Sequence, residues 1–218
     1  MRDALLSSPL VGRSTLAGPF QSSRGFAVIF KQPGRAEVEQ RFPALRPWLD
    51  ATLGRPAVQA LTPWWRRVSA PIPNAWYLNV LLVSEGGTVG RHVDATLRKP
   101  AGVDDAIPVL VSVLYLNVPD ATGGELQLWQ DGHSLALLRP RPNQGVHFRG
   151  DLSHEVRPFA AGTGQLRASL VIEQYHFAPD ALARLPDFKL DSKAGFGAYL
   201  EHHASLTSGA PRGDLDTR

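Results

Sequence analysis

The sequence predicts a mainly β protein with supporting helices, of the sandwich or jelly-roll class. Between residues 75 and 177, short runs of β-branched and aromatic residues alternate with glycine-containing turns. There is no internal repeat, and 218 residues with 43% apolar side chains suffice for one core but scarcely for two. We therefore expect one domain, with an N-terminal arm and supporting elements (1–75), a β core (76–178), and a C-terminal helix and polar tail (179–218).

The N-terminal third is expected to support the β core. Its first twenty residues are rich in Ser, Gly and Leu and predict a loosely held arm. A strand is expected at residues 25–30, followed by a helix in which Ala36, Val38, Phe42 and Leu45 recur at helical spacing. Prolines at positions 43 and 47 should break or restart that helix.

The β core is predicted as a series of short strands. They are expected at 76–83, 88–92, 109–118, 125–130, 134–138, 145–148, 154–159 and 165–177. Asp131-Gly132 is a hairpin signal, and a loop is expected at 95–105. From about residue 185 the chain becomes polar and rich in glycine, and residues 208–218 are expected to be poorly ordered.

Composition excludes several kinds of chemistry. The chain has no cysteine, so disulfides, thiolate metal sites and cysteine nucleophiles are excluded, and nitrogen and oxygen must hold any metal. The net charge is +3, but the arginines are scattered. We interpret Trp64-Trp65-Arg66-Arg67 as an aromatic core contact with solvated arginines rather than a nucleic-acid patch. No apolar run approaches the ~20 residues that span a bilayer, so we expect a cytoplasmic protein without a membrane partner.

The triplet His92-Val93-Asp94 is a candidate metal-binding motif. On a regular strand His92 and Asp94 share a face, because side chains repeat every second residue. With His154 from a later strand they would supply two imidazoles and one carboxylate, which hold one face of a ferrous ion and leave the other open. An isolated His-x-Asp is common by chance, so the interpretation depends on the later residues.

The remaining histidines are not expected to be ligands; they are His133, His147, His176, His202 and His203. His147 is the main rival of His154, but it lies among apolar neighbours.

Arg167 lies in an otherwise apolar predicted strand. An unpaired arginine is costly to bury, so it must meet an acid, either from the protein or from a ligand. Its planar guanidinium suits a bidentate carboxylate, and Ser169, two residues on, would point the same way.

Several of these residues together resemble a known family. They are His92-Val93-Asp94, Tyr115-Leu116-Asn117, Gly123-Gly124-Glu125-Leu126, Phe148, His154-Glu155-Val156 and Arg167-Ala168-Ser169. In order and context they resemble the iron(II)- and 2-oxoglutarate-dependent dioxygenases, specifically the prolyl-hydroxylase-like branch. The likeness covers roughly residues 76–177.

The resemblance implies a double-stranded β-helix with His92, Asp94 and His154 as metal ligands and catalytic centre. It further implies Fe(II), dioxygen and 2-oxoglutarate, whose distal carboxylate pairs with Arg167, with Ser169 and Tyr115 as helpers; ascorbate is a further candidate cofactor. An aromatic residue that lines this pocket in several relatives is missing, or is replaced by Tyr77 or Asn79.

The resemblance also implies hydroxylation of an unactivated C–H bond, because halogenating relatives lack the carboxylate. Residues of loop 95–105 could overhang the site, but we interpret its charges as solvated. We expect a small molecule, amino acid or peptide-like substrate, with a prolyl or other protein hydroxylase as the alternative. A non-catalytic cupin-like binding protein is the further alternative, a nucleic-acid substrate is disfavoured, and the oligomeric state is open.

Overall fold

The fold is described from a computed structural model. It covers residues 1–13, 16, 20, 23–53, 55–61, 71–162 and 164–194. The predictions for Trp64 to Arg67, for His202 and His203, and for 208–218 lie outside the described residues. Our division of the chain at residues 75 and 178 stays a prediction.

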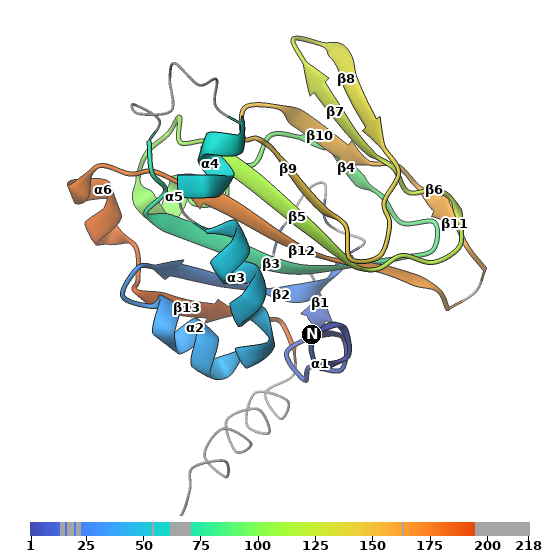
Figure 1. Ribbon diagram of the computed structural model, residues 1–218, viewed down its shortest axis with the longest axis horizontal. Helices are drawn as coiled ribbons and strands as arrows, with labels where there is room; N and C mark the ends of the chain where they lie inside the picture. Colours follow the sequence, from blue (N-terminus) through green and yellow to red (C-terminus); the bar gives the residue numbers. More distant parts are fainter. Residues whose placement is uncertain are drawn as a thin grey trace, which may run out of the picture.

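A seven-stranded antiparallel sheet forms the centre of the molecule (Figure 1). Its order is β1-β2-β3-β12-β5-β9, and β13 also pairs with β2. The strands are β1 Gly12–Arg13, β2 Ser23–Lys31, β3 Ala75–Ser84, β5 Leu110–Asn117, β9 Gly145–Arg149, β12 Leu166–Tyr175 and β13 Phe188–Asp191.

A smaller antiparallel sheet, in the order β4-β10-β7-β8, supplies the facing strands. Its strands are β4 Val89–His92, β7 Leu126–Gln130, β8 His133–Leu138 and β10 Ser153–Val156. A third, two-stranded sheet joins β6 Thr122–Gly123 to β11 Phe159–Ala160. This two-sheet β arrangement confirms the predicted jelly-roll class.

Side-chain alternation along the central strands divides the core into two layers. Even-numbered residues of β12, such as Leu170 and Ile172, belong to the largest core cluster together with Leu45 and Leu49 of the helical segment. Odd-numbered residues, among them Arg167 and Ser169, line a pocket on the opposite face of the sheet. Because side chains along a strand alternate between the two faces, the helices pack against one face of the sheet and a polar site lies on the other.

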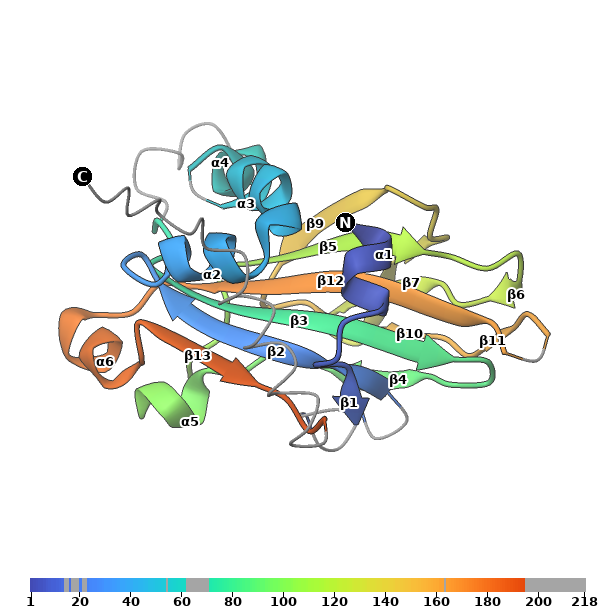
Figure 2. The same ribbon diagram turned by 90° about the horizontal axis from the view of Figure 1, so that it is seen from below.

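Helices cover the even-numbered face, as Figure 2 shows. They are α1 Arg2–Leu6, α2 Arg35–Arg41, a 3-10 turn η2 Pro43–Leu45, α3 Arg46–Thr52 and α4 Arg55–Leu61; α5 Arg98–Ala101 and α6 Pro179–Arg184 lie elsewhere. The break expected at Pro43 is present, and Pro47 lies in the first turn of α3, where its missing N–H costs nothing.

Two expectations about local structure were wrong, and one strand was not predicted. The described part of the N-terminal arm is packed rather than loose, because Leu5 and Leu10 are buried against the central sheet. The polar region after residue 185 contains the unpredicted strand β13, which pairs with β2. The expected loop 95–105 contains the single-turn helix α5, which ends at Gly102 in the left-handed conformation.

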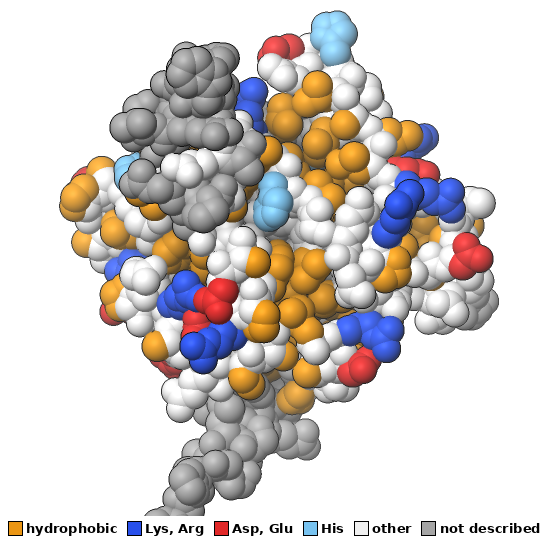
Figure 3. Space-filling model, in the orientation of Figure 1, with side chains coloured by type: hydrophobic (Ala, Val, Ile, Leu, Met, Phe, Trp, Pro, Cys, Tyr) orange, Lys and Arg blue, Asp and Glu red, His pale blue; other side chains and the backbone are white. Residues whose placement is uncertain are grey.

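On the face drawn in Figure 3, Lys and Arg side chains stand in separate groups, several beside acidic ones. None of the helices in the described residues is long and apolar enough to cross a membrane.

Candidate metal centre and adjoining pocket

The pairing of β4 with β10 brings two histidine side chains close together. His92 is the last residue of β4, and His154 is its direct partner across the antiparallel ladder. Directly opposed residues carry their side chains on the same face of a sheet. The ring centroids of His92 and His154 are accordingly 4.3 Å apart.

Asp94 reaches the two histidines from beyond the end of β4. A regular strand would carry His92 and Asp94 on one face, but β4 ends at His92, where the predicted strand 88–92 also ends, and Val93 is exposed. The chain nevertheless brings Asp94 Oδ1 to 3.3 Å from His92 Nε2 and Asp94 Oδ2 to 3.5 Å from His154 Nε2. One ligand atom from each residue lies within 4.8 Å of the others.

Backbone carbonyls fix the orientation of both imidazoles. His92 Nδ1 lies 2.7 Å from the carbonyl oxygen of Gly90, and His154 Nδ1 lies 3.2 Å from that of Leu152. A carbonyl oxygen only accepts hydrogen bonds, so each Nδ1 carries the proton and each Nε2 carries the lone pair. Both lone pairs are thus available on the side of Asp94.

The polar atoms of this cluster fit a metal ion. His92 Nε2 and Asp94 Oδ2 are buried and have no hydrogen-bond partner among the described residues. Buried polar atoms without partners are rare and usually have a ligand or function. Two neutral imidazole nitrogens and one carboxylate are the donor set that non-haem ferrous sites use.

The pKa values of the two histidines are shifted in opposite directions. Burial works against a charged His92, but the neighbouring carboxylate of Asp94 outweighs it and raises the pKa of His92. Burial lowers the pKa of His154, which Asp94 offsets only in part. A neutral His154 can offer its lone pair to an ion without first losing a proton.

Arg167 does not meet the protein acid that was one of its two expected partners. It is 4% exposed, and its Nε and Nη1 atoms are buried without a partner among the described residues. Its Cζ lies 5.0 Å from the centroid of the Tyr115 ring, a cation–π contact. Burial lowers the pKa of Arg167, and Tyr115 and Glu125 counteract this shift. The side chain is therefore available to a ligand acid.

Ser169 and Tyr115 lie beside this guanidinium. Ser169 of β12 is the register partner of Tyr115 in β5, and both side chains are buried. The Tyr115 hydroxyl has no hydrogen-bond partner in the described part of the chain, and burial raises the pKa of Tyr115 although Arg167 opposes the shift. We call His92, Asp94 and His154 the triad. These three residues line one pocket together with Arg167, Ser169 and Tyr115, and we call it the triad pocket.

Apolar side chains form much of the remaining wall of the triad pocket; they are Leu81, Val89, Val111, Val113, Leu126, Val156 and Val171. Asn79, one of the two replacements considered for the missing aromatic residue, lines it. Tyr77 instead belongs to a neighbouring core cluster.

Sequence reasoning missed three residues of the triad pocket. Leu16 and Phe20 come from the N-terminal arm, and the Phe20 ring lies edge-on to His92 with a centroid separation of 4.8 Å. Glu173 of β12 also lines the pocket and is completely buried. Nothing in the local sequence marks the first two, but Glu173 continues the alternation of Arg167 and Ser169.

Glu173 supports the segment that follows Asp94. Its carboxylate accepts hydrogen bonds from the Thr96 amide at 3.3 Å and the Thr96 hydroxyl at 2.7 Å, and from the Tyr175 hydroxyl. Burial, followed by the charge of Asp94, raises the pKa of Glu173 to about 8.

The rival histidines lie away from the triad. His147 is exposed on β9 and bonds the Ser112 hydroxyl through Nδ1 at 2.8 Å. His176 contacts the carbonyl oxygen of Ile72, and His133 is exposed at the β7–β8 hairpin. None of these three belongs to the described metal cluster.

Comparison with known proteins shows which family this part of the sequence resembles. Residues 77–172 match the family model described as the 2OG-Fe(II) oxygenase superfamily. The matched residues include the triad and Arg167. The chain is thus similar to the 2OG-Fe(II) oxygenase superfamily over this region.

Curated relatives of this chain are named PKHD-type hydroxylases. One from Pseudomonas putida strain F1 is 29% identical over 117 residues, which are 52% of this chain and 51% of the relative. Another, from P. putida strain W619, is 32% identical over 100 residues, 44% of each chain. The chain thus spans about half the length of the curated relatives it matches.

A solved structure agrees with the fold of this chain. The crystal structure of a Pseudomonas putida prolyl-4-hydroxylase has a TM-score of 0.50 at 21% identity, covering 81% of this chain and 82% of the other. Together with the curated relatives, it supports the predicted likeness to the prolyl-hydroxylase-like branch.

Proposed function

We propose that this protein is an iron(II)- and 2-oxoglutarate-dependent hydroxylase. The observation that carries the proposal is the convergence of His92, Asp94 and His154 in one pocket with the unpaired, buried Arg167. When bound, iron and 2-oxoglutarate would supply oxidation of a substrate C–H bond, coupled to loss of carbon dioxide from the co-substrate and formation of succinate.

The triad residues would hold the ion from one side. Both Nε2 atoms and the Asp94 carboxylate point into the same space, and the carbonyl oxygens of Gly90 and Leu152 keep the rings oriented. Three protein ligands leave further coordination positions for a chelating acid and for dioxygen. Retention of Asp94 favours hydroxylation, since the resemblance links halogenation to loss of this carboxylate.

Arg167 would bind and orient the far carboxylate of the co-substrate. Its planar guanidinium can make two parallel hydrogen bonds, and an acid there would neutralise a charge that otherwise has no ion-pair partner among the described residues. The hydroxyls of Ser169 and Tyr115 face the same pocket and can donate to the same carboxylate.

The apolar wall of the triad pocket would keep water from the reacting centre. Exclusion of water strengthens the electrostatic contacts inside a site and suppresses side reactions. Phe20 extends this wall directly against His92.

The substrate proposed is a small molecule, amino acid or peptide-like compound. The second candidate is a prolyl or other protein hydroxylase, and the hydroxylase and prolyl-4-hydroxylase names of the relatives support it. Free proline, proline-containing peptides and a set of amino acids, assayed side by side for succinate and hydroxylated product, distinguish the two.

The decisive experiment uses the purified protein without oxygen. Adding iron(II) and then 2-oxoglutarate should give the weak visible charge-transfer band expected for the chelated co-substrate. Admission of air with a substrate should then yield succinate and hydroxylated product in equal amounts. Absence of both the band and succinate formation would refute the oxygenase proposal in favour of a non-catalytic cupin-like binding protein, which needs no Arg167.

A further inference from the structure

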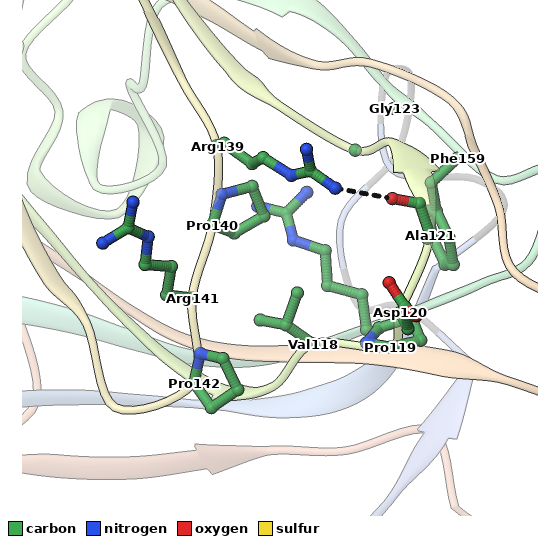
Figure 4. A pocket seen from close by; sticks show the side chains of 12 residues that line it. Val118, Pro119, Asp120, Ala121, Gly123, Arg139, Pro140, Arg141, Pro142 and Phe159 are labelled. Carbon is green, nitrogen blue, oxygen red and sulfur yellow. Dashed lines mark hydrogen bonds between the residues drawn. The ribbon is translucent and has the colours of Figure 1, made fainter.

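A second pocket lies beside the triad pocket and shares Arg167 with it. Its volume is about 260 Å³, and Figure 4 shows it from close by. Two loops form its walls: residues 118–124, which lead from β5 into β7, and residues 139–142, which lead from β8 to β9. We call it the arginine pocket.

The arginine pocket contains a cation that the protein does not neutralise. Arg139 crosses from one loop to the other and donates from Nη2 to the carbonyl oxygen of Ala121 at 3.2 Å (Figure 4). No ion pair of Arg139 is found among the described residues. Together with Arg141 and the buried, unpaired Arg167, it gives the pocket three guanidinium groups against the single exposed carboxylate of Asp120.

The walls of the arginine pocket are stiff. Pro119, Pro140 and Pro142 restrict the backbone of both loops. Gly123 has φ +84°, and a Cβ there would come within 2.2 Å of the Pro158 carbonyl oxygen, so only glycine fits. A stiff, positively charged pocket binds an anion at little conformational cost.

We propose that the arginine pocket is an anion subsite for small dicarboxylates, at which 2-oxoglutarate docks on its way to Arg167 and from which succinate leaves. This inference rests on the proposed function. Arg139 would meet the incoming carboxylate first, at the exposed end of the pocket, and Arg167 would receive it at the buried end. A positively charged entrance raises the rate of association with an anion and makes that rate sensitive to salt.

Arg141 provides a matched control in the same loop. It is exposed and contributes to the pocket lining, but in Figure 4 its guanidinium points away from Ala121 and Arg139. Arg139→Gln and Arg141→Gln change the net charge equally. Arg24→Gln, at an exposed position on β2, controls for charge elsewhere.

The first test measures succinate binding to the metal-free protein by calorimetry. Wild type and Arg24→Gln should bind with similar affinity, and Arg141→Gln, which removes a lining charge that points away, should lose at most about twofold. Arg139→Gln should bind at least about fivefold more weakly, and Arg139→Lys should retain most of the affinity. Equal binding by Arg139→Gln and Arg141→Gln, or no binding by wild type, overturns the proposal. Equal affinity for inorganic phosphate also overturns it, because the pocket would then hold anions without regard to shape.

The second test follows 2-oxoglutarate association with the iron(II)-loaded protein by anaerobic stopped flow. Arg139→Gln should lower the association rate constant by about three- to tenfold and weaken its dependence on ionic strength, while the final amplitude stays unchanged. An unchanged rate constant overturns the proposed docking role. If wild type gives no charge-transfer band at all, the proposed function fails, whereas the calorimetric result still decides whether the dicarboxylate subsite exists.

Discussion

The ring of Phe20 stands edge-on to the imidazole of His92, with 4.8 Å between the two centroids. The contact joins residues 72 positions apart in the chain and places an arm residue against a proposed metal ligand. Phe20 lines the triad pocket without offering a ligand atom, so it shapes the space next to the ion rather than the ion site itself.

Replacing Phe20 by alanine should therefore separate metal binding from substrate positioning. We expect iron content and 2-oxoglutarate binding to stay within about twofold of wild type, because the triad and Arg167 are intact. Product formed per succinate should fall several-fold, because a misplaced substrate reacts poorly. Phe20→Leu, which keeps an apolar side chain, is the control; equal coupling in all three proteins would exclude a positioning role.

Loss of a triad histidine should have a different effect from loss of its nearest rival. His154→Ala removes one of three ligands, and we expect iron(II) affinity to fall by more than about 100-fold. His147→Ala, on the outer strand β9, should leave the metal content unchanged. Metal analysis after dialysis against a weak chelator measures both. Full iron retention by the His154 variant would remove it from the site.

Arg167→Met should improve stability while it abolishes co-substrate binding. A buried charge without a partner costs free energy of folding, and even the replacement of a buried ion pair by apolar residues of similar volume is often neutral or stabilising, by up to about 1–4 kcal/mol. The lost contact with the Tyr115 ring offsets about 0.5–1 kcal/mol of this.

Thermal unfolding of the metal-free protein and titration with 2-oxoglutarate test the two effects of Arg167→Met. A gain of 1 kcal/mol raises the melting temperature by about 2–4 °C in a chain of this size. Arg167→Lys, which keeps the charge, should restore part of the binding. Unchanged 2-oxoglutarate affinity in the methionine variant would contradict the anchor role.

Glu173 should make the metal-free protein less stable as the pH rises. Its pKa is about 8 in the folded protein against a reference value of 4.5, so the folded state binds the proton more tightly. The resulting stabilisation is complete below pH 4.5 and is lost as the pH rises towards 8. Melting temperatures between pH 5 and 8 should decline less steeply for Glu173→Gln than for wild type, whereas Asp104→Asn, at an exposed position, should decline like wild type. Parallel curves for all three proteins would refute this.

The part of the site on β12 could be predicted because it depends on local periodicity. Arg167 and Ser169 share a face by alternation, and an arginine among apolar residues indicates a buried acid partner. Their proposed roles remain predictions, but their placement in one pocket with the triad agrees with them.

Other features depend on contacts that the local sequence does not carry. Phe20 reaches His92 only through the path of the arm, which the pattern of Ser, Gly and Leu does not specify. β13 was missed because its four residues, Phe188–Asp191, are half charged and gain their order from pairing with β2. The path from His92 to Asp94 could not be predicted, because a spacing of two residues fits a strand as well as a turn.

The position of His92 at the end of β4 links the proposed metal site to the edge of the smaller sheet. β4 is an edge strand of only four residues, bonded on one side to β10; no strand of the described residues pairs with its other side, and such edges can associate with another chain. An ion shared by His92, Asp94 and His154 would clamp the end of this strand to its neighbour. Metal loading would thus also guard against aggregation, since a protein stripped of its ion would expose a loosened strand edge.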